Sequence, residues 1–181
     1  IIESDIGHLS FQEYFVKHQS EPCIRNISFN GSTEASLSPE LKTVIRDNGF
    51  KAIIVCPSNP YLSIDPILSI EEIKSFIESA SIPVVAVSPI VDGKALRGPA
   101  AKIMHEMDIP VSVKSIAEHY HPLIDGLVID HKDKIISSEI QSMGIEVQVT
   151  NTVMNHDSDK IQLAQDVVEF SQMISVKKDS L

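Results

Sequence analysis

The feature that most constrains the fold is a run of apolar residues from Pro83 to Val87. A short, continuous apolar run of this kind is typical of a strand that is buried on both faces. The run leads into a loop at 88–98 and then into an amphipathic pattern over residues 100–107, which predicts a helix. A strand, a glycine-containing loop and a helix therefore follow one another here.

The same alternation recurs along the chain and predicts a parallel sheet. Ser10 and Glu13 form a capping-box pattern at the start of one predicted helix. Strands are predicted at 1–6, 23–29, 52–56, 124–130 and 145–149, with 52–56 in the centre, and helices at 10–18, 38–47, 69–79, 111–120, 132–143 and from 158. Asn48-Gly49 is expected to end the second helix, and residues 177–181 are expected to be loose. We therefore predict a three-layer Rossmann-like α/β fold, with a mostly parallel sheet and helices on both faces.

Composition fits one domain spanning residues 1–181 and narrows the choice of partners. The chain has 181 residues and a formal net charge of -10, which argues against binding nucleic acid or an anionic membrane surface. No apolar run reaches the roughly 20 residues that a membrane span needs, and the start lacks the layout of a signal peptide. We expect a cytoplasmic protein. Its two cysteines, Cys23 and Cys56, lie in apolar runs and are expected to be buried, reduced thiols.

Ligands of such sheets bind beyond the carboxyl ends of the strands, which makes four loops candidates: 58–63, 88–98, 130–131 and 150–157. In the second loop, two glycines let the backbone approach a ligand, and Lys94, Arg97 and Lys102 add positive charge. A phosphate site and an ordinary strand-to-helix connection with solvated cations both remain open. Asn59, in the first loop, either contacts a ligand or caps its own backbone.

Other patterns are weaker. His119 and His121 lack the spacing of a zinc pair on a helix. Asp125 and Asp130 either ligate magnesium beside a bound phosphate or, as strand-end aspartates commonly do, cap the next helix. No serine has the surroundings of a nucleophile, and no catalytic base is assignable.

Four blocks carry a resemblance to a known family. They are FQEYFVK at 11–17, PSNPYLSIDPIL at 57–68, PVVAVSPIVDGKALRGPAAKIM at 83–104, and the stretch from LIDGLVID to VTNTVM at 123–154. In order and spacing they resemble the 2-phospho-L-lactate transferase family of coenzyme F-420 biosynthesis. The family also has an amino-terminal strand with a GGTGG loop, followed by acidic residues that serve metal and deazaflavin, and this chain lacks both. We therefore expect it to be the carboxyl-terminal part of a longer transferase, inactive alone if the missing loop is essential.

The resemblance implies transfer of a 2-phospho-L-lactyl or enolpyruvyl-phosphoryl group from a guanosine diphosphate-linked donor to the deazaflavin Fo, with release of GMP. It implies Mg²⁺ as cofactor, with its ligands outside this chain, and we expect a homodimer. The residues assigned by matching motifs to contacts with the donor's nucleotide or phosphate are Ser58, Asn59, Ser88, Gly93, Lys94 and Gly98. Two alternatives remain: a non-catalytic nucleotide or nucleotide-sugar sensor similar to the gluconeogenesis-factor proteins, and a structural fragment that binds nothing.

Overall fold

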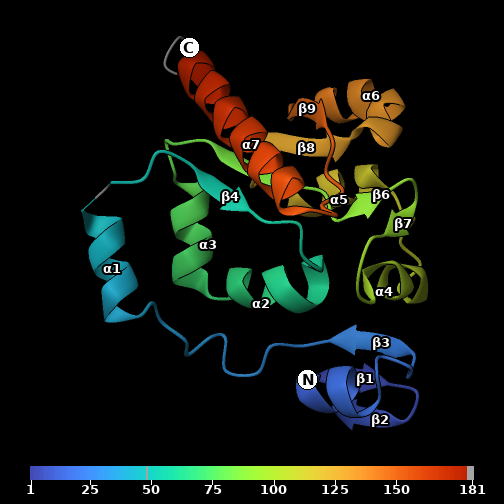
Figure 1. The fold of residues 1–181 in the computed structure, drawn as a ribbon. Helices are drawn as coiled ribbons and strands as arrows, with labels where there is room; N and C mark the ends of the chain where they lie inside the picture. The colour runs from blue at the N-terminus through green and yellow to red at the C-terminus, as the bar shows by residue number, and fades with distance from the viewer. Residues whose placement is uncertain (48, 179–181) are drawn as a thin grey trace.

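The computed structural model describes residues 1–47 and 49–178 and is organised around a sheet of four parallel strands (Figure 1). The strand order is β4-β5-β8-β9. The strands are β4 Ile53–Val55, β5 Val84–Val87, β8 Gly126–Asp130 and β9 Glu146–Thr150. Every neighbouring pair runs parallel, so the four carboxyl ends share one edge of the sheet.

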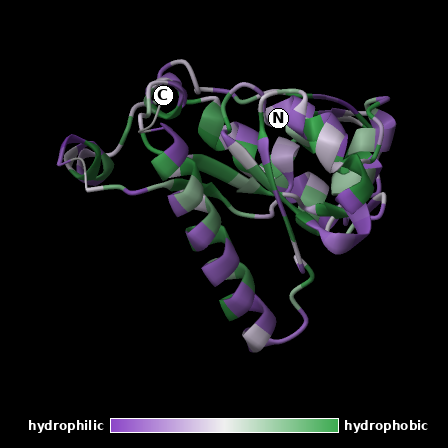
Figure 2. Cartoon of the chain, turned by 90° about the horizontal axis from the view of Figure 1, so that it is seen from above, coloured by the Kyte–Doolittle hydropathy of each residue, from purple (hydrophilic) through white to green (hydrophobic). Residues whose placement is uncertain are grey.

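The inner strands, β5 and β8, confirm the buried apolar run of the sequence. Every residue of both strands is buried, because helices cover both faces of the sheet. On one face, the long helix α7 Asp157–Lys178 packs against Val85, Val87 and Val128. Figure 2 shows the central strands in green, whereas α7 carries hydrophilic and hydrophobic residues along its length. A larger core on the opposite face contains the alternate strand residues Val84, Ala86, Leu127 and Ile129.

The larger core is covered by short helices, which complete a three-layer Rossmann-like α/β fold. Apolar side chains of α4 Ala100–Glu106 and α5 Val113–Tyr120 are fully buried in it. The other helical elements of this region are η2 Pro60–Ile64, α2 Asp65–Leu68, α3 Glu71–Glu78, η3 His131–Ile136 and α6 Ser137–Gln141. None of the helices within the described ranges could cross a membrane.

The prediction that 52–56 is a central strand is wrong. β4 lies at one edge of the four-stranded sheet, and Ile54 is 38% exposed. Ile54 pairs in register with Val85, which is fully buried, yet only Val85 belongs to the cluster packed by α7. An apolar run alone therefore did not show whether the strand had neighbours on both sides.

A small antiparallel sheet, in the order β2-β1-β3, forms the amino-terminal region. Its strands are β1 Ile2–Ser4, β2 Gly7–Leu9 and β3 Ile24–Ile27, and the turn η1 Glu13–Lys17 lies between β2 and β3. The predicted capping box is confirmed. The Glu13 carboxylate accepts hydrogen bonds from the Ser10 backbone and hydroxyl, both at 2.9 Å, and the Glu13 N–H donates to Ser10 Oγ at 3.3 Å.

Two further expectations are tested at the periphery. The helix predicted from residue 38 is α1 Pro39–Arg46, which Ser38 caps, although none of its residues is buried. The stop predicted at Asn48 lies outside the described residues. Both cysteines are exposed rather than buried, because they lie just outside the strands, before β3 and after β4.

The tail is ordered further than expected. Lys177 and Lys178 complete α7 and bind Glu146 and Asp125 at 2.7 and 2.8 Å. Asp125 also accepts a hydrogen bond from the Val84 N–H at 2.8 Å, so this contact fixes the end of α7 beside the start of β5. Residues 179–181 lie outside the described part of the chain.

Candidate functional site

A cavity of about 660 Å³ lies where three of the predicted loops meet. Its walls include Ser58 and Asn59 after β4, Pro89, Arg97 and Gly98 after β5, and Thr152 to Asn155 after β9. These loops converge at the carboxyl edge of the sheet, where ligands of such folds bind, and their contact with a ligand stays a prediction. The fourth loop, 130–131, does not line the cavity.

Asn59 confirms the capping interpretation of its loop. Its Oδ1 accepts hydrogen bonds from the N–H groups of Tyr61 and Leu62 at 3.0 and 3.1 Å and so caps the helical turn η2. Its Nδ2 is buried and has no partner among the described residues. A buried N–H donor without a partner costs free energy. The capping contact fixes the side chain, and a contact between Asn59 and a ligand stays a prediction.

The loop after β5 contains a hairpin that was not predicted from the sequence. The strands β6 Ile90–Val91 and β7 Lys94–Ala95 pair around Asp92-Gly93, and both turn residues have positive φ, 52° and 66°. Asp-Gly between short apolar segments is a strong signal for a type I′ hairpin. Gly93 therefore serves the turn, and it does not line the cavity.

The other assigned residues of this loop fall in different places. Ser88 is buried beneath the hairpin, where its hydroxyl donates to the Ile90 carbonyl at 3.0 Å and accepts from the Ile90 N–H at 3.1 Å. Lys94 is exposed on β7 and lies outside the cavity wall. Gly98 lines the cavity with φ 69°, and a Cβ atom added there would meet no heavy atom within 4 Å. The cavity thus brings together Ser58, Asn59 and Gly98.

Positive charge reaches the cavity from two residues that carried no site assignment. Arg97 lines it and forms no ion pair within the described residues, while Lys160, from α7, lines it and binds Asp157 at 2.8 Å. Lys160 comes from more than 60 residues away in sequence, so no local motif could have indicated its place. Arg97 was visible as a cation of the loop, yet its spacing did not distinguish it from Lys94.

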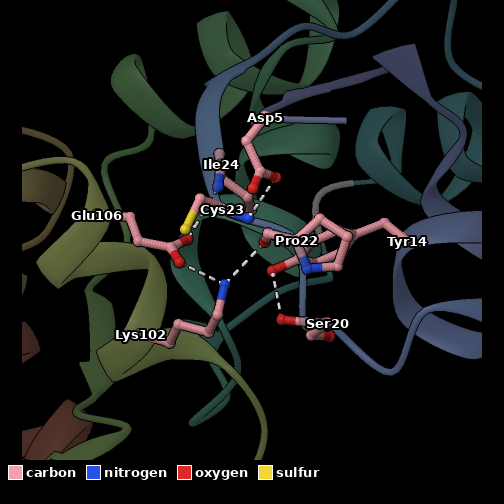
Figure 3. A network of polar contacts seen from close by, with 8 residues as sticks. All are labelled: Asp5, Tyr14, Ser20, Pro22, Cys23, Ile24, Lys102 and Glu106. Atoms are coloured by element: carbon pink, nitrogen blue, oxygen red, sulfur yellow. Dashed lines mark hydrogen bonds and ion pairs between the residues drawn. The ribbon is translucent and has the colours of Figure 1, made fainter. Parts of the chain in front are cut away.

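Lys102, the third cation of the sequence motif, has a structural role (Figure 3). Its ammonium donates to the Pro22 carbonyl at 2.8 Å and forms an ion pair with Glu106 one turn away. Glu106 also accepts from the Ile24 N–H at 2.9 Å. Burial opposes the charged form of Lys102, but the contacts with Glu106 and Tyr14 together outweigh it and raise the pKa of the lysine. These contacts join α4 to the amino-terminal sheet and leave Lys102 unsuited to a phosphate.

The strand-end aspartates also act within the fold. Asp130 caps η3 by accepting from the Lys132 N–H at 3.1 Å, and it accepts from the Thr152 N–H at 3.0 Å. The capping interpretation is therefore confirmed for Asp130. Asp133 accepts from the Asp92 N–H at 3.2 and 3.1 Å and so holds the hairpin, while burial raises the pKa of its carboxyl. Asp130 thus fixes Thr152 in the cavity wall, and Asp133 fixes the turn of the hairpin.

The cavity does not have the composition of a magnesium site. Magnesium is usually held by one or two carboxylates together with substrate phosphates, and no Asp or Glu lines this cavity within the described ranges. Nor do residues 1–47 and 49–178 contain, elsewhere, a group of three His, Cys, Asp or Glu side chains that could hold a metal ion. His119 pairs instead with Asp65 at 2.8 Å.

Two aromatic side chains complete the cavity wall. Phe11 and Phe15, from the segment that contains η1, line it together with Leu62 and Leu96. The sequence predicted the helical turn but indicated no role for these rings. A cavity with an apolar wall, two cations and an exposed glycine backbone can hold an anionic ligand that also carries an apolar part.

Comparison with known proteins identifies relatives. The sequence model of the family described as 2-phospho-L-lactate transferase CofD matches residues 1–172. A 2-phospho-L-lactate transferase of Methanocaldococcus jannaschii is 37% identical over 169 residues, covering 93% of this chain and 52% of that protein. One of Methanopyrus kandleri is 34% identical over 172 residues, covering 93% and 53%. The chain therefore spans about half the length of the curated relatives it matches.

Proposed function

Because the chain belongs to the 2-phospho-L-lactate transferase family, we propose that it contributes to transfer of a phospholactyl-type group from a guanosine diphosphate-linked donor to the deazaflavin Fo. The ribityl hydroxyl oxygen of Fo forms a bond to the phosphorus that carries the lactyl or enolpyruvyl group. The bond from that phosphorus to the bridging oxygen breaks, GMP leaves with that oxygen, and the hydroxyl proton passes to solvent or to a base that we do not assign.

The single observation that carries this proposal is the presence of Arg97, without an ion-pair partner among the described residues, in a cavity at the carboxyl edge of the sheet. The chain as a whole is strongly acidic, with a formal net charge of -10. Within the described ranges, the cavity wall gathers Arg97 and Lys160 and contains no carboxylate. It is therefore a local exception that suits a diphosphate. Arginine can contact two phosphate oxygens at once, which fixes orientation as well as charge.

Transfer between phosphoryl groups depends on positioning and on neutralising charge more than on a protein nucleophile. In this proposal, Arg97 and Lys160 neutralise the donor diphosphate, and Asn59 Nδ2 donates to a donor oxygen. Ser58 and Gly98 supply further polar contacts at the same wall. Ser88 acts indirectly by holding the hairpin. The contacts assigned by motif to Gly93 and Lys94 remain predictions, although neither residue lines the cavity.

Magnesium remains a prediction for this reaction. When bound to a diphosphate, the ion neutralises charge on the phosphate oxygens. The described part of the cavity wall offers the ion no carboxylate. A homodimer and a cytoplasmic location are likewise proposed, and light scattering at several protein concentrations tests the first.

The proposed transfer is tested by measuring whether the donor releases GMP and whether this release depends on Fo. The full-length gene product that contains this chain is the appropriate sample. GMP formation in the presence of both substrates, and its absence without Fo, supports transfer. Nucleotide binding without GMP release would instead indicate the sensor-type function.

A further inference from the structure

Phe11 and Phe15 form a stacked pair whose rings remain open to solvent. Their centroids are 5.4 Å apart and their planes differ by 15°. The exposed fractions of the two residues are 41% and 43%. Aromatic pairs usually contribute by burying large areas, so a pair that stays about two-fifths exposed leaves much of its apolar surface without a partner among the described residues.

Contacts on both sides of the pair fix its position. Tyr14, between the two phenylalanines in sequence, is fully buried, and its hydroxyl donates to the Ser20 carbonyl at 3.3 Å. The capping box of Ser10 and Glu13 fixes the start of the same turn. Because Tyr14 occupies the core-facing side, the turn cannot rotate to bury the phenylalanines. The rings are therefore held in place before any ligand binds.

The pair lies on the wall of the cavity that also contains Asn59 and Arg97. This arrangement places an aromatic surface and a charged, hydrogen-bonding surface in one space of about 660 Å³. A ligand that combines a planar ring with a phosphate would use both surfaces. Val16, on the same turn, is 64% exposed but does not line the cavity.

We propose that Phe11 and Phe15 form a stacking platform for the planar heteroaromatic ring of a ligand in this cavity. The inference deepens the proposed function and rests on it for the two sources of such a ring, the guanine of the donor and the deazaflavin of the acceptor. Stacking suits either source, because it requires a π-face rather than a particular pattern of hydrogen bonds.

Calorimetric titration of the full-length gene product with GDP and, separately, with Fo tests the platform. When an aromatic side chain that stacks on a base is replaced by alanine, the affinity typically falls by about 5- to 150-fold. We expect Phe15→Ala and Phe11→Ala each to weaken binding of one ligand by at least about fivefold. Loss confined to GDP identifies guanine as the stacked ring, and loss confined to Fo identifies deazaflavin.

Two further variants separate stacking from general apolar packing. Phe15→Leu keeps an apolar side chain without a π-face and should weaken binding nearly as much as Phe15→Ala, whereas Phe15→Trp should retain affinity. Val16→Ala is the matched control on the same turn and should bind like the wild type. Thermal melting of each variant checks that the fold is retained.

The outcomes distinguish failure of the platform from failure of the proposed function. If the wild type binds GDP or Fo and the phenylalanine variants bind equally well, the platform is overturned and the proposed function stands. Equal loss in Val16→Ala, or full affinity in Phe15→Leu, also overturns stacking. If the folded wild-type protein binds neither GDP nor Fo, both proposals are overturned.

Discussion

Replacing Gly126 by alanine should destabilise the protein by forcing α7 away from β8. A Cβ atom at this position would lie 2.6 Å from Ile174 Cδ1 and 2.7 Å from Phe170 Cε1. Carbon atoms pack best at about 3.5–4.0 Å, so the closest contact is too short by about 1 Å. Both neighbours are only 4% exposed and belong to the cluster that packs α7 on the sheet. The added methyl therefore has no open space to enter.

The expected cost follows from these contacts. Inserting a methyl group into a packed core typically costs about 1–3 kcal/mol. Two buried side chains must move here, but the contacting atoms are the ends of side chains rather than backbone, so we expect about 2 kcal/mol. For a chain of this size, that loss corresponds to a fall in Tm of about 4–8 °C. Urea unfolding followed by circular dichroism measures the free energy of unfolding directly.

Two comparisons make this test specific. Gly49→Ala is the matched control, because a Cβ there meets no heavy atom within 4 Å, and it should change stability by no more than about 0.5 kcal/mol. Ile174→Val removes the closest contacting atom. It should therefore cost less in the Gly126→Ala background than in the wild type, with a coupling of at least about 0.5 kcal/mol. Equal stability of Gly126→Ala and Gly49→Ala, or strict additivity with Ile174→Val, would refute this account of the α7 interface.

Three more substitutions test the edge strand, the cavity and the hairpin. Ile54→Asp should lower the free energy of unfolding much less than Val85→Asp, because Ile54 is 38% exposed and Val85 is fully buried. Equal losses in urea unfolding would indicate that β4 is a central strand after all. Arg97→Ala should weaken donor binding by about 1.5–3 kcal/mol, the worth of a charge-assisted hydrogen bond, and by more than Lys94→Ala; calorimetry showing the reverse order would favour the motif-based assignment of Lys94. Burial raises the pKa of Asp133, so the folded state loses stability as pH rises from the ordinary range of an aspartate through that raised pKa. Asp133→Asn should therefore gain stability relative to the wild type as the pH rises above the ordinary range of an aspartate pKa, about 3.5–4, and a difference that is independent of pH would contradict this.

Local patterns predicted the local parts of the fold. The apolar run at Val84 to Val87 indicated a buried strand, and Ser10 with Glu13 indicated a capping box, because each depends on neighbours in sequence. The hairpin at Asp92-Gly93 was missed although its signal was present, since the glycine was interpreted as room for a ligand. The position of β4 at the sheet edge could not be predicted, because an apolar strand has the same pattern whether one or both edges are paired.

The candidate site was predictable in its loops but not in its charges. Ligands of parallel sheets bind at the carboxyl ends of the strands, which singled out the loops of Asn59, Gly98 and Thr152, and these loops line one cavity. Lys102 could not be distinguished from a ligand contact until its partner across the fold, the Pro22 carbonyl, was known. Lys160 reaches the cavity only through the tertiary packing of α7.

Fo-dependent release of GMP tests the central claim most directly. The full-length gene product is incubated with the guanosine diphosphate-linked donor, with and without Fo and with and without Mg²⁺, and GMP and modified Fo are quantified by mass spectrometry. The account predicts GMP and phospholactyl-type Fo in equal amounts, formed only when Fo is present. Nucleotide that binds but remains intact with Fo and Mg²⁺ both present would contradict the transferase proposal.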